Sequence, residues 1–127
     1  MPLTHRPVTE EDIALICSFP QSEAELFFLY PKASFPLTAS ALRNAIAQRS
    51  DATVVVLDGQ VVAFANFYRA EWCGHCAIGN VVVCPAARGC GVGGYLIQTM
   101  AALAFAKYQA TEVRVSCSKQ NLAGLLR

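Results

Sequence analysis

One stretch decides the fold of this chain: Val81-Val82-Val83-Cys84-Pro85-Ala86-Ala87-Arg88-Gly89-Cys90-Gly91-Val92-Gly93-Gly94. Its β-branched start favours a strand, its middle is an Arg/Gly-rich turn, and the residues after it are typical of a long apolar helix. Glycines let the turn adopt backbone conformations barred to other residues, and the following helix directs its unpaired N–H groups and positive dipole end at the turn. The stretch therefore predicts a pyrophosphate-binding turn with Arg88 as an adjacent cation.

Two common phosphate-binding patterns do not fit this turn. A Walker P-loop requires Gly-Lys-Ser/Thr after the glycines, and none follows here. A dinucleotide-binding fingerprint requires an acidic residue at the end of a strand about twenty residues later. Glu112 instead begins the next predicted strand, so neither pattern explains the glycines.

The composition is that of one globular domain. The chain has 127 residues, 54% of them hydrophobic and 15% charged, which excludes disorder and predicts a large core. A net charge of +1 without a basic run argues against nucleic-acid binding. The longest apolar stretch, residues 101–106, is far shorter than the roughly twenty residues of a membrane span, and the N-terminus lacks a signal-peptide pattern. We therefore expect a cytoplasmic protein without a membrane partner, whose six cysteines are reduced thiols.

The order of the predicted elements indicates a mixed sheet. Thr9 is predicted to cap a first helix after a short strand, and Ser22 with Glu25 forms the capping box of a second helix. Asp58-Gly59 between two apolar runs is the strongest short hairpin signal. The further predicted elements are a helix at 39–49, strands at 53–57, 61–69, 77–83 and 112–117, the long helix at 91–108 and a final helix from 121. They form an antiparallel meander, a crossover helix and a parallel strand, which is the α/β (α+β) class.

The spacing Arg-Gly-x-Gly-x-Gly after Val-x-Pro resembles the acyl-coenzyme A binding motif of the GNAT superfamily of N-acetyltransferases. Arg-Pro-x-Thr-x-x-Asp from Arg6 and Asn-x-Ala-Gly-Leu from Asn121 are also similar to sequences of that superfamily. The resemblance covers nearly the whole chain and implies a single GNAT-like domain over residues 1–127, with a mainly antiparallel sheet flanked by helices. Relatives continue beyond the position of Arg127 into a helix with a Tyr and two further strands, so we expect a C-terminally short member that lacks the last strands.

The resemblance also implies which residues bind acetyl-coenzyme A (acetyl-CoA). Main-chain groups of Val81 and Val83 would pair with the pantetheine arm as an added strand, and an amide near Val82 would polarise the thioester carbonyl. Asn121 would contact the pantetheine or order a water near the thioester; alternatively, it is only the N-cap of the last helix. The pyrophosphate would be bound by the backbone N–H groups of the turn, which belong to Arg88, Gly89, Cys90, Gly91, Val92, Gly93 and Gly94.

The function expected from the resemblance is acetyl-CoA-dependent transfer to a primary amine of a small molecule or of a protein or peptide. The reaction needs a held thioester, an oxyanion donor, a neutral amine and a proton for the departing thiolate. Asn80 can orient a water but cannot take a proton. The other candidates near the implied acceptor cleft, each also explained as a capping or solvated residue, are Glu23, Glu25, Tyr30 and Glu71.

Two alternatives to catalysis by a monomer stay open. The chain could be a non-catalytic acyl-CoA-binding or interaction module, since the expected acid Tyr is absent. An open edge beside the strand at 112–117 would also pair two copies of the chain into a homodimer.

Trp72-Cys73-Gly74-His75-Cys76 matches the active-site string of protein disulfide isomerases. That chemistry requires the first cysteine at a helix N-terminus, where the dipole stabilises the thiolate. Residues 77–83 predict a strand instead, so thiol-disulfide exchange through Cys73 and Cys76 is a remote alternative. A metal site formed by this string with Cys84 or Cys90 is not expected either, because structural zinc sites usually combine two ligand pairs.

Overall fold

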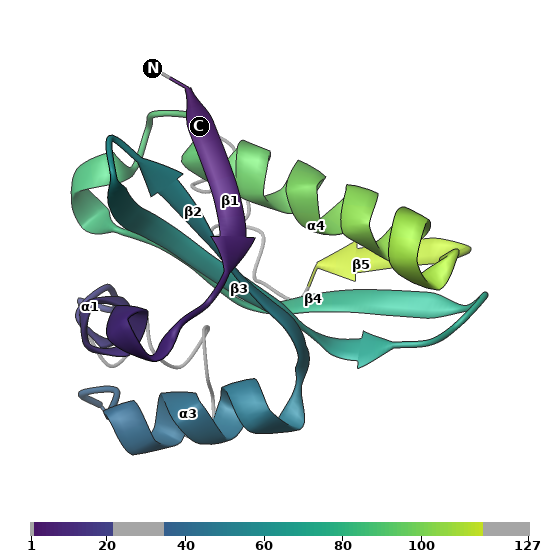
Figure 1. Ribbon diagram of the computed structural model, residues 1–127, viewed down its shortest axis with the longest axis horizontal. Coiled ribbons are helices and arrows are strands. Elements are labelled where there is room, and N and C mark those ends of the chain that lie inside the picture. Colours follow the sequence, from purple (N-terminus) through teal and green to yellow (C-terminus); the bar gives the residue numbers. More distant parts are fainter. Residues whose placement is uncertain (1, 22–34, 116–127) are drawn as a thin grey trace.

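A five-stranded sheet in the order β1-β2-β3-β4-β5 forms the centre of the computed structural model, which describes residues 2–21 and 35–115 (Figure 1). Neighbouring strands are antiparallel from β1 to β4, and β5 is parallel to β4. The strands are β1 (Leu3–Pro7), β2 (Ser50–Leu57), β3 (Gln60–Ala70), β4 (His75–Val83) and β5 (Glu112–Val115). The predicted mixed, mainly antiparallel sheet is confirmed.

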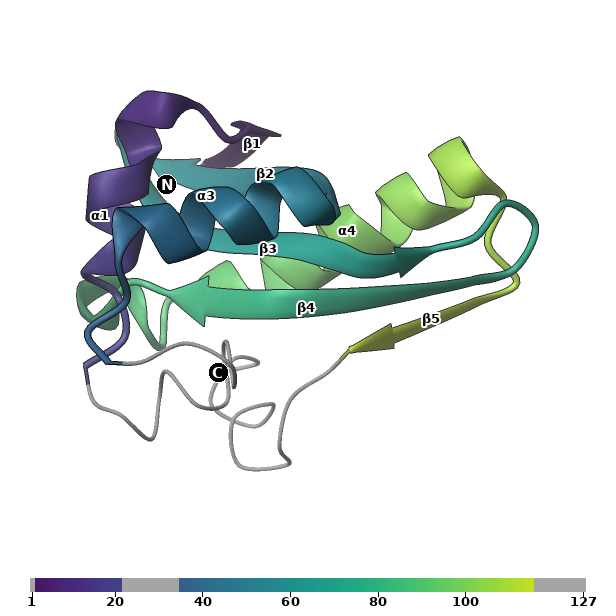
Figure 2. The same cartoon turned by 90° about the horizontal axis from the view of Figure 1, so that it is seen from below.

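Helices cover both faces of this sheet. In the described residues they are α1 (Ile13–Cys17), α3 (Ala39–Gln48) and α4 (Val92–Tyr108), with 3₁₀ turns η1 (Glu10–Asp12) and η2 (Pro85–Ala87). Helix α4 lies on one face, and α1 and α3 lie on the other (Figure 2). The helices predicted from Ser22 and from Asn121 lie outside the described residues.

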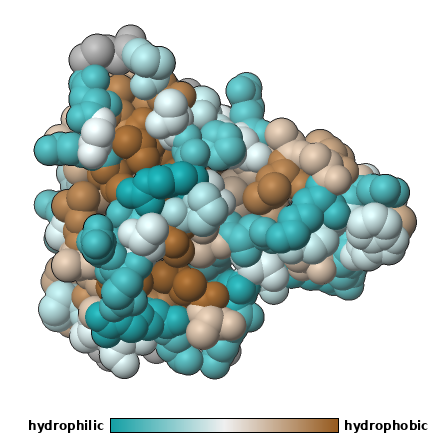
Figure 3. Space-filling view, viewed as in Figure 1, coloured by the Kyte–Doolittle hydropathy of each residue, from teal (hydrophilic) through white to brown (hydrophobic). Residues whose placement is uncertain are grey.

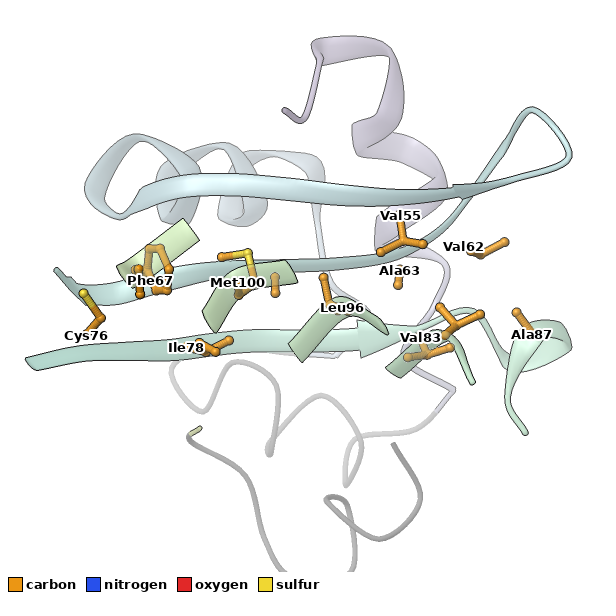
Figure 4. Packing of buried hydrophobic residues seen from close by; sticks show 13 residues of the cluster. Val55, Val62, Ala63, Phe67, Cys76, Ile78, Val83, Ala87, Leu96 and Met100 are labelled. Atoms are coloured by element: carbon orange, nitrogen blue, oxygen red, sulfur yellow. The ribbon is translucent and has the colours of Figure 1, made fainter. Parts of the chain in front are cut away.

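The two faces have separate apolar cores. On the α4 side, Leu96 and Met100 are fully buried in one cluster with Phe67 and Ile78 (Figure 4). The cluster on the other face consists of Ile13, Ile16, Phe19, Leu37, Leu42, Val54, Val61, Phe64 and Val82. Strand β3 contributes side chains to both clusters, which explains why its sequence is an almost unbroken apolar run.

The hairpin between β2 and β3 is formed as its sequence predicts. Asp58 and Gly59 have positive φ angles of 53° and 79°, and Leu57 pairs with Gln60. Strand β2 begins at residue 50 instead of the predicted 53, because a bulge at Asp51, with φ of 57°, extends its pairing with β3. The Asp51 carboxylate holds this bulge on α4 by accepting hydrogen bonds from the Lys107 ammonium and the Tyr108 hydroxyl.

Apolar surface is exposed in several separate areas that are interrupted by hydrophilic side chains (Figure 3). The exposed large apolar residues of the described part are Leu15, Phe35, Tyr68, Trp72 and Phe105. Scattered apolar residues of this kind are normal on a monomer surface and do not by themselves indicate a partner. None of the described helices is long and apolar enough to cross a membrane.

Candidate cofactor and active site

Among the described residues, strand β5 pairs with only the first part of β4. Their parallel pairing runs from His75 opposite Glu112 to Ile78 opposite Val115. Beyond that point, the rest of β4 up to Val83 pairs with β3 on its other side and with no further described strand. The divergence of β5 from β4 is visible in Figure 2. In the described part of the chain, this section of β4 therefore presents a free backbone edge.

A β-bulge lies where the two strands separate. Phe64 pairs with Val82 and Asn66 pairs with Gly79, so β4 has one residue more than β3 between these pairs. Asn80 lies in the bulge with a positive φ of 50°. A bulge bends its strand and increases the local twist, so it changes the direction of β4 directly before Val81–Val83.

The backbone of Val83 faces this open edge. The Cys84 amide donates to the Val62 carbonyl at 2.7 Å, which makes these two residues a hydrogen-bonded pair of the ladder. Val83, opposite Ala63, is the next residue, and in an antiparallel pair such a residue turns its N–H and C=O away from the neighbouring strand. The Val83 carbonyl accepts a hydrogen bond from Nε of Arg88 at 3.3 Å, which ties the glycine turn to the end of β4.

The glycine-rich turn connects β4 to the start of α4. Gly89 and Gly91 have φ angles of 84° and 78°, in the left-handed region that favours glycine. Helix α4 begins one residue later than predicted, with Gly91 as its N-cap, and its first backbone bond joins the Tyr95 amide to the Gly91 carbonyl at 3.1 Å. The amides of residues 92–94 precede that bond and therefore form the helix N-terminus, where an anion is favoured.

Open space in front of this turn leaves room for a ligand. A methyl group added at Gly89, Gly91 or Gly94 would meet no atom within 4 Å. The side chains of Arg88 and Cys90 are exposed beside the same turn. The helix N-terminus, the adjacent guanidinium and the open space together are suited to an anionic group.

The described candidates for proton transfer differ in their surroundings. Asn80 is 5% exposed, and its carboxamide oxygen accepts a hydrogen bond from Asn66 at 2.9 Å. Glu71 lies at the far end of β4, in the turn after β3, where its ion pair with Arg69 (2.9 Å) lowers the pKa of its carboxyl and weakens it as a base. The remaining candidates lie outside the described residues and are Glu23, Glu25, Tyr30 and Asn121.

Asn66 and Arg49 are not among the predicted site residues. Asn66 lies in the apolar run of β3, and Arg49 follows the last residue of α3. The structure brings them together with a hydrogen bond of 3.4 Å from Nη1 of Arg49 to Oδ1 of Asn66. A polar residue within a buried strand was the only available signal, because the sequence does not indicate that this Asn faces Asn80.

The cysteine string does not have the geometry of a redox site. Cys73 is exposed in the turn before β4 with a positive φ of 54°, and Cys76 is fully buried inside that strand. The predicted strand after Cys76 is confirmed, so no helix dipole stabilises a thiolate here. In residues 2–21 and 35–115, no three His, Cys, Asp or Glu side chains are grouped so that they could hold a metal ion.

Several solved structures share this fold. Aminoglycoside acetyltransferase AAC(6')-Ib in complex with coenzyme A superimposes with a TM-score of 0.69 at 19% identity, covering 95% of this chain and 78% of that one. A transcriptional regulator from Bacillus halodurans has a TM-score of 0.70 at 20% identity, covering 98% and 87%. Glucosamine-6-phosphate N-acetyltransferase from Arabidopsis thaliana has a TM-score of 0.62 at 15% identity, covering 95% and 86%.

Sequence comparison adds the family. No curated protein sequence matches this chain. Residues 15–125, however, match the family described as "Acetyltransferase (GNAT) family". This match confirms the resemblance carried by the glycine turn. The chain therefore belongs to the GNAT family of N-acetyltransferases, whose acetyl donor is acetyl-CoA.

Proposed function

We propose that this chain transfers the acetyl group of acetyl-CoA to a primary amine of a small molecule or of a protein or peptide. The observation that carries the proposal is that, among the described residues, β4 after Ile78 pairs only with β3, so that its other backbone edge is free directly before the glycine turn. One end of an extended ligand would lie along this edge, and its other, anionic end would lie at the N-terminus of α4. Membership of the GNAT family supports an amine as the acceptor.

Each part of the site has a proposed role. The N–H groups of residues 88–94 bind the pyrophosphate, assisted by the positive end of the α4 dipole. Main-chain groups of Val81 and Val83 bind the pantetheine arm in the manner of an added strand. Bound acetyl-CoA supplies an activated thioester. The amide near Val82 donates a hydrogen bond to its carbonyl oxygen, where negative charge develops when the neutral amine attacks.

Two asparagines are proposed to contribute to proton transfer or cofactor binding without acting as bases. Asn80 would orient a water at the bulge, and this water would pass the proton of the attacking amine to solvent. The C–S bond of the thioester would break as the C–N bond forms, and the coenzyme A thiolate would leave and take a proton from solvent. Asn121 would contact the pantetheine or order a second water. Because a carboxamide does not titrate in this range, the reaction rate should follow the protonation state of the acceptor amine and rise with pH.

The second candidate function is a non-catalytic acyl-CoA-binding module. The observation in its favour is that Glu71, the described carboxylate among the predicted candidates, is paired with Arg69 at the opposite end of β4 from the glycine turn. Such a module would keep the cofactor site and lack turnover. Pairing of two copies along β5 stays a prediction that either function would allow.

One titration and one assay together test the proposal. Amide resonances of residues 81–83 and 89–94 should shift when coenzyme A is added, whereas amides of the β2–β3 turn should not. Acetyl-CoA should then acetylate at least one member of a panel containing aminoglycosides, amino sugars, polyamines and peptides, detected as released thiol and as an acetylated product by mass spectrometry. Shifts without any acetylated product would favour the binding module. A chain with no shifts in these amides would not be a coenzyme A protein.

A further inference from the structure

A buried polar chain supports the β4 bulge from the strand beside it. Asn66 on β3 is fully buried, and its Nδ2 donates to Oδ1 of Asn80 at 2.9 Å. Its Oδ1 accepts from Nη1 of Arg49 at 3.4 Å. A guanidinium at the start of such a chain strengthens the hydrogen bonds that follow it, because each amide is polarised by the one before.

Asn80 needs support of this kind because of its backbone. Its φ of 50° lies in the left-handed region, which Asn tolerates better than most residues but still at a cost. The bulge lies between the pairs Phe64–Val82 and Asn66–Gly79 and therefore has to persist inside the ladder that joins β3 to β4. The hydrogen bond that the Asn66 side chain donates to Asn80 forms only in one orientation of Asn80, and its free energy would offset that cost.

We propose that Asn66 is a positioning residue: it holds Asn80 and the β4 bulge in the conformation that keeps the edge at Val81–Val83 open to the pantetheine arm. Arg49 fixes the orientation of the Asn66 amide. Neither residue touches the cofactor. The inference rests on the proposed function, since it assigns a role to two residues behind the same site.

Packing around Arg49 gives independent support. The guanidinium lies 5.6 Å from the centroid of the Tyr68 ring. A methyl group added at Gly79 would lie 2.6 Å from Cδ1 of Tyr68 and 2.9 Å from Nη1 of Arg49. Arg49 and Tyr68 therefore lie directly on β4 at a residue without a side chain. The position of the guanidinium is fixed by the strand whose bulge it supports.

Two ligands separate positioning from general stability. Acetyl-CoA uses both the glycine turn and the β4 edge, whereas adenosine 3′,5′-bisphosphate has the nucleotide end and lacks the pantetheine arm. Asn66→Ala should weaken acetyl-CoA binding by about three- to tenfold, as expected for one lost buried hydrogen bond, and should change bisphosphate binding by less than about twofold. Thr53→Ala is the matched control. It removes a hydrogen bond of the same sheet, from the Thr53 hydroxyl to the Asp51 carbonyl at 2.7 Å, but this bond does not involve β4. It should leave the ratio of the two affinities unchanged.

A second background tests the mechanism of the effect. Glycine adopts positive φ without the cost of a side chain. In a protein that carries Asn80→Gly, the bulge no longer needs Asn66 for its conformation. In this background, adding Asn66→Ala should change the ratio of acetyl-CoA affinity to bisphosphate affinity by less than about twofold relative to Asn80→Gly alone. A smaller effect of Asn66→Ala here than in the wild type shows that the two residues are coupled.

Each result has a distinct meaning. An equal loss for both ligands, or an unchanged ratio in Asn66→Ala, would overturn the positioning role. If Asn66→Ala does not fold, Gly79→Ala replaces it, because its methyl group displaces Arg49 and should shift the ratio in the same direction. Wild-type protein that binds neither ligand would instead refute the proposed function, so the two failures are distinguishable.

Discussion

Gly91 and Gly59 have nearly the same positive φ, 78° and 79°, but only Gly91 lies in the proposed pyrophosphate turn. A methyl group added at either position meets no atom within 4 Å. Replacement of either residue by Ala therefore imposes the same left-handed backbone strain without a collision inside the protein. The pair of variants separates the effect of strain from the effect of an obstructed ligand.

The strain should be equal in the two variants. An L-residue in this conformation costs about 1–2 kcal/mol, so Gly91→Ala and Gly59→Ala should each lower the free energy of unfolding by that amount. For a domain of this size, the Tm should fall by about 3–8 °C. Only Gly91→Ala should lose coenzyme A. The methyl group occupies the space in front of the α4 amides, and loss of one charge-assisted hydrogen bond of about 1.5–3 kcal/mol corresponds to roughly a ten- to hundredfold weaker Kd.

Calorimetric titration with coenzyme A measures the Kd, and thermal unfolding of the same samples measures the Tm. Gly59→Ala should bind coenzyme A with an affinity within about twofold of the wild type, because its turn belongs to the β2–β3 hairpin. Equal affinities of the two variants, at equal losses of Tm, would refute the assignment of the turn at residues 88–94 as the pyrophosphate site.

Two further predictions concern other residues. Cys90 and Cys73 are both exposed, and saturating coenzyme A should slow alkylation of Cys90 at least severalfold and leave Cys73 unaffected, as read by mass spectrometry of labelled peptides; equal protection would place the ligand elsewhere. Asp12 accepts two hydrogen bonds from Arg6 (2.8 and 3.0 Å), which lower the pKa of its nearly buried carboxyl. The pair is therefore stabilising above an unfolded pKa near 4 and is lost as the pH falls through the lower folded pKa. Asp12→Asn should cost about 1–3 kcal/mol in urea unfolding near pH 7 and progressively less in acid, whereas a gap independent of pH would contradict this origin.

Local signals in the sequence predicted most of the architecture. Asp58-Gly59 specified the β2–β3 hairpin because a two-residue turn of this type requires positive φ at both positions, and the structure has both. Helix α4 was predicted within one residue because its apolar stripe and its flanking glycine are local features. Family membership was predicted from the glycine spacing. It is confirmed over residues 15–125.

The geometry behind the site was not predictable in the same way. The bulge at Asn80 depends on how β4 pairs with β3, and Asn66 meets Asn80 only after that register is set. Arg49 reaches Asn66 across 17 residues of sequence, from the end of a helix. These are long-range contacts whose partners a single sequence does not indicate.

Two of the bulges in the sheet show how the fold maintains costly backbone conformations. Asp51 in β2 and Asn80 in β4 both have positive φ inside a strand. Each is held by polar side chains from another element: Asp51 by the last turn of α4, and Asn80 by Asn66 on β3. The Asp51 carboxylate reaches an exposed ammonium, whereas the Asn80 amide is buried with its partner. Loss of the Asn66 side chain would therefore remove a hydrogen bond between two buried amides. Both bulges are thus held by side chains of another element, and the one beside the proposed cofactor edge is held from within the core, as a site that depends on a fixed strand edge requires.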